Sequence, residues 1–220
     1  MPKKNISGNA YGLTLLCPIK NGSLNDQSYA EILRDYLENL PLDGQSPMAK
    51  IPNTYFARFY VLNDVFYEGF PVKEEHLKSK YLVFSSNFHG DRDTYVRGMW
   101  DSDVATVKTI KTIWRDCVAF DEVNTAEDFI DYVKKCQVDN NLFFNGSTGD
   151  SLAEQLKALY LKQEFTRFAY ENQGLSAQDL QENFKKFVER TEPSNLAGPS
   201  WSPGVPAAEP TPMTVVSPSP

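Results

Sequence analysis

The 220-residue sequence predicts an α+β domain, in which helices pack against an antiparallel sheet. Short runs rich in aromatic and β-branched residues predict the strands. Longer stretches with apolar residues every three or four positions predict the helices. Hydrophobic residues make up 41% of the chain and aromatic residues 13%, which is enough to bury a core.

The composition along the chain sets the limits of this domain. Eight of the 14 prolines fall between Pro193 and Pro220, mixed with serine, alanine and glycine. Such a segment buries too little apolar area to offset the entropy cost of ordering it. We therefore expect a flexible N-terminus over residues 1–10, a folded domain over 11–190 and a disordered, Pro-rich tail over 191–220.

The first elements along the chain are a strand, a helix and a second strand. Residues 11–17 form an apolar run that predicts a strand. Between Tyr29 and Leu40, apolar residues recur on one face of a helix. Residues 54–62 are mostly aromatic or β-branched and predict the second strand. Candidate N-caps of the helix are Asn25, Asp26 and Ser28.

The remaining elements follow the same rules. They are a strand over 80–86, a helix from Asp91 or Asp93 to Trp100, helices over 103–117 and 125–135, a strand over 141–145, and helices over 150–172 and 176–190. The order is β-α-β-β-α-β with extra helices. This order is typical of the ferredoxin-like arrangement, a four-stranded antiparallel sheet with helices on one face.

Both faces of the predicted sheet carry apolar side chains. In the strand over 54–62, Phe56 and Tyr60 share one side, whereas Phe59 and Val61 share the other. An antiparallel sheet with one wet face normally alternates apolar and polar residues. We therefore expect the face opposite the helices to be covered by a second subunit, by the C-terminal helices or by a ligand.

Arg58 lies within this apolar strand, on the side of Phe56 and Tyr60. A buried guanidinium needs an anionic partner, because an unpaired buried charge is costly. One hypothesis is that Arg58 binds the carboxylate or phosphate of a ligand. The alternatives are an ion pair with Asp64 or a helix carboxylate, and a position at the rim of the sheet.

The segment from Phe84 to Asp91 is predicted to lead from a strand end through a polar loop into a helix start. Backbone N–H groups at a helix start can bind an anion, and His89 can act as a base or ligand. The alternative is an ordinary strand-to-helix connection, in which Asn87 shapes the turn and Asp91 caps the helix.

Composition and missing motifs exclude several classes of function. The net charge of −7 argues against a nucleic-acid or anionic-membrane partner, and no apolar run reaches the length of a membrane span. Three widely spaced cysteines and two histidines predict no metal site, and the thiols are expected to be buried and reduced in a cytoplasmic protein. No catalytic signature points to a reaction, so the cofactor stays unknown.

Three segments resemble an uncharacterised bacterial family whose motifs read LTVxAPIKPG, HFARFVVLDD and LLFxSNFDG. They are Tyr11–Gly22, Tyr55–Asp64 and Leu82–Gly90. That family is similar to the dimeric α/β-barrel superfamily, in which two ferredoxin-like sheets pack face to face. Arg58 would match the strand arginine of the family and Asn87 its loop asparagine. Tyr55 stands where the family has histidine, and His89 where it has aspartate.

The resemblance implies a homodimer and, if the chain is an enzyme, an oxidoreductase of the peroxidase or monooxygenase kind. Together with the residues it gives one hypothesis, a protein that holds an apolar or acidic small molecule against the aromatic sheet face. The alternative is a non-catalytic interaction module that uses a dimer surface and the Pro-rich tail, including Met213–Val216. Ligand-binding candidates are Phe56, Arg58, Tyr60, Phe84, Asn87 and His89; the aromatic cavity would also include Phe59 and Phe143.

Overall fold

A computed structural model describes residues 4–65, 70, 76–147 and 149–206, and within them the chain is α+β, as expected. The strands are β1 (Ile6–Ser7), β2 (Ala10–Pro18), β3 (Ser23–Leu24), β4 (Gln27–Ser28), β5 (Thr54–Leu62) and β6 (Tyr81–His89). The α-helices are α1 (Tyr29–Glu38), α2 (Arg92–Trp100), α3 (Val104–Trp114), α4 (Ala126–Cys136), α5 (Leu152–Glu171) and α6 (Ala177–Thr191). Short 3-10 turns cover Pro47–Lys50 and Phe120–Glu122.

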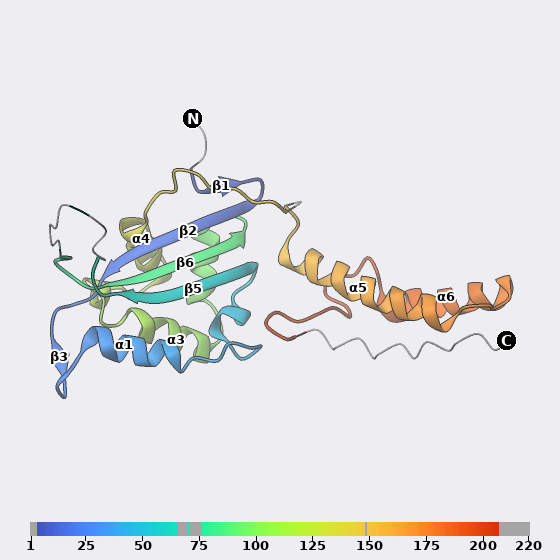
Figure 1. Ribbon diagram of the computed structural model, residues 1–220, viewed down its shortest axis with the longest axis horizontal. Helices are drawn as coiled ribbons and strands as arrows, with labels where there is room; N and C mark the ends of the chain where they lie inside the picture. Colours follow the sequence, from blue (N-terminus) through green and yellow to red (C-terminus); the bar gives the residue numbers. More distant parts are fainter. Residues whose placement is uncertain (1–3, 66–69, 71–75, 148, 207–220) are drawn as a thin grey trace.

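The main sheet has four strands in the order β1-β2-β6-β5, and all neighbours are antiparallel (Figure 1). Because β6 lies between β2 and β5, these two strands run parallel to each other and are connected through α1. Strand β5 has the predicted bounds, and β6 extends three residues beyond its predicted end, to His89. The helix starts also follow the sequence, since Ser28, Asp91, Ser151 and Ser176 each accept a backbone N–H as N-caps.

The predicted strand over 141–145 is wrong, because these residues form no strand. Their place beside β2 is taken by β1, which comes from the segment 1–10 that the sequence predicts to be flexible. Asn140 holds the segment against the sheet instead, since its side-chain Nδ2 donates to the carbonyl of Gly12 (3.0 Å) and its backbone N–H to Oδ1 of Asn5 (2.6 Å). Residues 138–140 therefore lie beside β2, where the N–H of Val138 donates to the carbonyl of Thr14 (2.9 Å). The residues that follow cross one face of the sheet, with Phe143 over Gly12.

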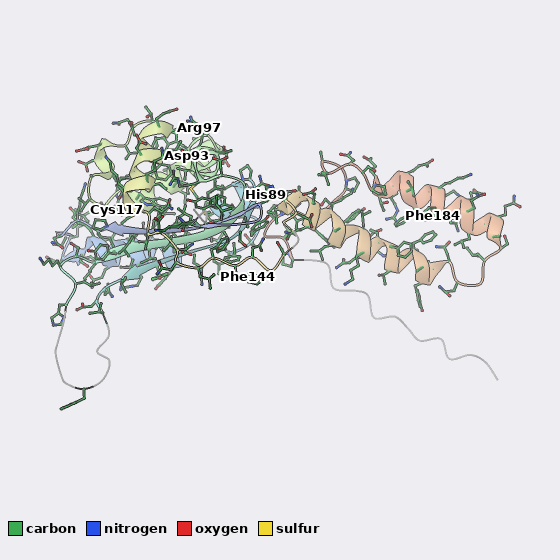
Figure 2. The ribbon with its side chains drawn as sticks, turned by 90° about the horizontal axis from the view of Figure 1, so that it is seen from above. His89, Asp93, Arg97, Cys117, Phe144 and Phe184 are labelled. Atoms are coloured by element: carbon green, nitrogen blue, oxygen red, sulfur yellow. The ribbon has the colours of Figure 1, made fainter. Side chains whose placement is uncertain are left out.

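The other face of the sheet forms a single core with α1, α2, α3 and α4. Leu13, Leu82 and Phe88 of the sheet are fully buried in it, as is Trp114 of α3. Trp114 packs edge-on against Phe84 and Phe129, with ring centroids 5.5 Å apart in both cases. Figure 2 shows the helical layer on this side, with Cys117 in it, and Phe144 on the opposite side.

The C-terminal helices, one of the three possible covers that the sequence left open for the second face, do not cover it. Helices α5 and α6 form a hairpin that extends away from the sheet (Figure 1). The hairpin has its own buried charges, since Glu164 pairs with Arg167 (2.9 Å) and with Arg190. The hairpin thus has contacts of its own between the two helices.

The tail predicted to be disordered over 191–220 is partly ordered. Thr191 ends α6, and residues 192–206 fold back along α5. The buried ammonium of Lys157 donates to the carbonyls of Thr191 and Pro199, both at 2.7 Å. These charge-assisted hydrogen bonds hold the start of the tail against α5, and composition alone does not predict them. The remainder of the tail, including Met213–Val216, lies outside the described residues.

Candidate functional site

The sheet surface that faces away from α1–α4 is called the open face here. Three cross-strand rows make it up: Gly12–Asn87–Phe56, Thr14–Ser85–Arg58 and Leu16–Val83–Tyr60. Phe56 is 52% exposed and Tyr60 51%, so the prediction that both faces are dry is wrong for the single chain. The polar neighbours Thr14, Ser85 and Asn87 explain the difference, because they give this face the mixed character of a wet surface.

Arg58 lies on the open face beside Phe56, as predicted from the alternation of the strand. Its guanidinium carbon is 5.9 Å from the centroid of the Phe56 ring, within the range of a cation–π contact. Among the described residues it has no ion pair. Its charge is therefore available to an anion from solution.

The proposed structural partner of Arg58 is engaged elsewhere. Asp64 accepts the backbone N–H groups of Val65 and Leu77, each at 2.9 Å, and lies 2.7 Å from Nδ1 of His76. These hydrogen bonds, that of Leu77 first, lower the pKa of Asp64 to about 2. The ion pair between Arg58 and Asp64 that the sequence allowed is thus absent from the described structure.

A cavity of about 180 Å³ opens between the open face and the start of α5. Phe143, from the segment that crosses the sheet, forms its cover. A Cβ atom at Gly12 would lie 2.8 Å from the Phe143 ring, so only glycine allows this ring to lie so close to β2. The cavity is lined by Ala10, Tyr55, Phe56, Asn87, Phe143, Asn145, Ser147 and Gln155.

Asn87 is the polar group that the sheet itself presents to this cavity. Its side chain is half-buried, and it makes no hydrogen bond to the residues that the structure describes. Asn145 and Gln155 are already engaged, since Oδ1 of Asn145 accepts the N–H of Ser147 and Nε2 of Gln155 donates to the carbonyl of Asp150. Asn87 is therefore the lining amide whose oxygen and nitrogen both lack a hydrogen bond within the described residues, whereas Asn145 and Gln155 each use one of the two.

A β-bulge at Tyr55 ties the sheet to α5. The register shifts between Thr54 and Phe56, and this turns Tyr55 toward the end of the strand. Its hydroxyl donates to the carbonyl of Asp150 (2.7 Å) and lies 3.2 Å from Nδ1 of His89. Because a hydroxyl has one proton, Nδ1 of His89 is the donor in that second bond. Burial, together with the charges of Asp150 and Glu154, raises the pKa of Tyr55.

His89 therefore positions Tyr55 and does not line the cavity itself. The predicted loop around it is also corrected, since Asn87 and His89 both belong to β6. Asp91 caps α2 by accepting the N–H of Thr94 at 2.9 Å. The start of α2 is thus occupied by the carboxylate of the chain, and the anion site suggested there is not formed.

Phe84 is the candidate that the structure places elsewhere. It is 1% exposed and stacks on Phe59 in the helical core, with ring centroids 4.5 Å apart. Both side chains point away from Phe56 because of the strand alternation. The predicted aromatic cavity thus combined residues from two faces of the sheet, and Phe84 and Phe59 do not belong to the site.

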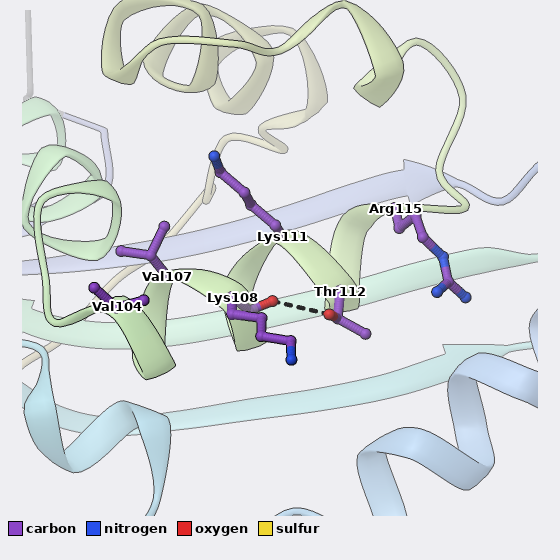
Figure 3. A pocket seen from close by; sticks show the side chains of 6 residues that line it. All are labelled: Val104, Val107, Lys108, Lys111, Thr112 and Arg115. Carbon is purple, nitrogen blue, oxygen red and sulfur yellow. Dashed lines mark hydrogen bonds between the residues drawn. The ribbon is translucent and has the colours of Figure 1, made fainter.

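A second cavity, of about 370 Å³, is a groove along the outer side of α3 (Figure 3). It is lined by Val104, Val107, Lys108, Lys111, Thr112 and Arg115. Two of its cations already have partners, since Lys111 lies over the ring of Trp100 (4.4 Å) and Arg115 pairs with Asp116 (2.9 Å). The described residues contain no group of histidine, cysteine or carboxylate side chains arranged to hold a metal ion.

Asn145, Ser147 and Gln155 are site residues that the sequence did not indicate. Asn145 ends the segment predicted to be a strand, Ser147 follows it, and Gln155 belongs to α5, whose start is held by the contact between Tyr55 and Asp150. In the described part of the chain, no helix combines the length and apolarity that crossing a membrane requires.

Comparison of the chain with protein-family models, curated proteins and solved structures finds no match. The site is therefore interpreted from its own chemistry.

Proposed function

We propose that the chain binds a small carboxylic acid on the open face, with its apolar part in the cavity and its carboxylate at Arg58. The observation that carries this proposal is the position of Arg58, whose charge lacks an ion pair within the described structure and lies over the ring of Phe56, a residue that lines the cavity. Asn87 adds a free amide beside the same ring. An apolar cavity with a few convergent polar groups is the usual form of a small-molecule site.

The size of the cavity limits the ligand class. Sites for drug-sized ligands occupy roughly 300–1,000 Å³, whereas this cavity measures about 180 Å³. A porphyrin exceeds this space, so the cavity does not fit a haem group. A single ring or a short aliphatic chain that carries a carboxylate fits better.

The arrangement of strands adds support to this proposal. Strands β2, β6 and β5 lie in the order expected for the first three strands of a ferredoxin-like sheet, and β1 lies where the fourth would be. In the dimeric α/β-barrel superfamily, two such sheets pack face to face, and that pairing would enclose the open face. The similarity concerns the fold and by itself implies no reaction.

The test is a calorimetric titration of the full chain with phenylacetate and with phenylacetamide, which has a similar size and no charge. We expect phenylacetate to bind more tightly, because only its carboxylate can pair with the guanidinium. Arg58→Gln should weaken phenylacetate binding by about tenfold or more, since a hydrogen bond between charged groups contributes about 1.5–3 kcal/mol.

Arg34→Gln on α1 is the matched control, because it removes the same charge from the helical side of the sheet. Equal affinities for the two compounds, or an Arg58→Gln variant that binds as the original chain does, would overturn the proposal. Asn87→Ala adds a second arm. A loss of affinity in this variant for both compounds would place the ring of the ligand in the cavity.

A second candidate function is self-association through the open face. Large apolar side chains are exposed there and on the crossing segment, with Phe144 80% and Leu142 87% exposed. A second copy of the chain would bury these groups together with Phe56 and Tyr60. Sedimentation velocity tests this, because Phe144→Asp should convert a dimer into a monomer. A monomer at all concentrations in the unmodified chain would exclude this candidate.

A further inference from the structure

Three cysteines from separate elements meet on the helical side of the sheet. Cys17 lies near the end of β2, Cys117 follows α3, and Cys136 is the last residue of α4. Backbone bridges fix their relative positions, since Ile19 pairs with Cys117 and Leu15 pairs with Gln137. The three thiols are free, and no disulfide joins them in this structure.

The surroundings of these thiols contain few hydrogen-bonding groups. The side chains of Tyr132 and Trp114 are buried, and their Oη and Nε1 atoms find no hydrogen-bond partner. Burial, and after it the electrostatic influence of the three thiols, raises the pKa of the Tyr132 phenol. Sulfur is a weak acceptor, which accounts for the unsatisfied hydroxyl. The described structure offers no carboxylate or imidazole that completes a metal site with these thiols.

Cys17 and Cys136 differ in ways that suit two chemical roles. Cys136 is half-buried, whereas Cys17 is fully buried. A hydrogen bond from Cys17 lowers the pKa of Cys136 to about 7, and the neighbouring Lys135 acts in the same direction. The same contact, with burial, raises the pKa of Cys17. Cys136 thus provides an accessible thiolate at neutral pH, and Cys17 keeps its proton beside it.

We propose that Cys136 and Cys17 form a reversible disulfide when the protein meets hydrogen peroxide. Cys136 is the residue that reacts with the oxidant, and Cys17 is the residue that resolves the product. Cys117 is not the reacting thiol, because it is buried, and the hydrogen bond of Cys17 goes to Cys136 and not to Cys117. This inference does not depend on the ligand proposed for the open face.

The chemistry balances in two steps. The Cys136 thiolate attacks one peroxide oxygen, the O–O bond breaks, and hydroxide leaves and takes up a proton as water. The sulfur is oxidised to a sulfenic acid, and the peroxide is reduced. The Cys17 sulfur then attacks the Cys136 sulfur, the S–S bond forms, and the hydroxyl leaves with the Cys17 proton as a second water.

The disulfide would join the end of α4 to β2 next to the Leu15–Gln137 bridge. Residue 137 begins the segment that carries Phe143 across the open face. Oxidation would therefore hold the base of this segment on the sheet.

The experiment treats the full chain with hydrogen peroxide, blocks the remaining thiols with N-ethylmaleimide and maps the peptides by mass spectrometry. We expect a Cys17–Cys136 linkage with Cys117 alkylated after denaturation, and complete reversal by dithiothreitol. Irreversible sulfinic acid at Cys136 with Cys17 unchanged would overturn the proposal. A linkage that includes Cys117 would overturn it as well.

Variants assign the roles of the two cysteines. Cys17→Ala should stop the reaction at the sulfenic acid, which dimedone traps on Cys136, and Cys117→Ala should leave the linkage intact. Cys136→Ser should abolish the reaction with peroxide. Peptide mapping of the unmodified chain decides the proposal by itself, even where a core substitution prevents folding. Dimedone labelling of Cys17 in place of Cys136 would reverse the assignment and contradict it.

Discussion

The two faces of the sheet carry similar aromatic side chains, which are buried on one face and half-exposed on the other. On the helical face, Phe84 is 1% exposed and contacts Phe59 and Trp114, whereas on the open face Phe56 is half-exposed beneath a guanidinium. Phe56 and Phe59 are three residues apart on one strand. The aromatic residues of a strand therefore do not decide whether its face is buried; the elements that pack on that face do.

The largest expected contrast between the faces is in stability. Phe84→Ala should lower the free energy of unfolding by about 3–5 kcal/mol, because it leaves a cavity in a closely packed core. Phe56→Ala removes the same atoms from a half-exposed position and should cost less than about 1 kcal/mol. Urea unfolding of the two variants measures both values. A Phe56→Ala loss as large as that of Phe84→Ala would mean that the open face is covered in solution.

Tyr95 offers a second probe of the helical face. Its buried hydroxyl lies 2.8 Å from Oγ of Ser86 and 3.1 Å from Oγ1 of Thr54. Tyr95→Phe removes both hydrogen bonds and should destabilise the protein by about 1–3 kcal/mol. The same unfolding measurement checks this value, and Tyr60→Phe on the open face is the control that should change little. Equal effects of the two substitutions would contradict the difference between the faces.

The pH dependence of stability follows from the same residue. Burial raises the pKa of Tyr95 to about 12, above its ordinary value of 10. The folded state thus favours the neutral phenol, and this contribution is complete below pH 10 and lost as the pH rises toward 12. The difference in stability between the original chain and Tyr95→Phe should shrink over this range. A difference that stays constant up to pH 12 would contradict burial of this hydroxyl.

Gly12→Ala tests how closely the crossing segment lies on the open face. The new Cβ would meet the Phe143 ring at 2.8 Å, so the ring has to move, at a cost of about 1–2 kcal/mol. Phenylacetate affinity should fall with it, because Phe143 covers the cavity. Gly98→Ala in α2 meets Pro52 only at an ordinary 3.8 Å and should stabilise the protein slightly. An undisturbed Gly12→Ala variant would show that Phe143 does not rest on β2.

Local patterns predicted the fold well where local interactions decide it. The bounds of β5 follow from its side chains, and Ser28, Ser151 and Ser176 cap the predicted helices. Predictions failed where contacts with residues distant in the sequence decide the structure of a segment. Residues 141–145 have the side chains of a strand, but β1 occupies the edge of the sheet.

The prediction of a disordered tail fell short for the same reason. The carbonyl of Pro199 accepts a hydrogen bond from Lys157, which lies 42 residues earlier in the chain.

The site was predicted in part. Strand alternation placed Phe56, Arg58 and Tyr60 on one face, and the structure confirms this placement. Phe84 shares the side of Phe59 because the two residues are cross-strand partners, and this register does not follow from the aromatic character of the side chains. The polar residues Ser85 and Asn87 next to Phe84 were the available signal that the second face is wet.

Chemical modification of tyrosine tests the central claim most directly. The full chain is treated with tetranitromethane, and the nitrated residues are identified by mass spectrometry with and without phenylacetate. The claim predicts that Tyr60 is nitrated, that the buried Tyr95 is not, and that phenylacetate protects Tyr60. If Tyr60 is not nitrated in the ligand-free chain, the face is not open in solution. Equal nitration of Tyr60 with and without phenylacetate would contradict the proposed binding there.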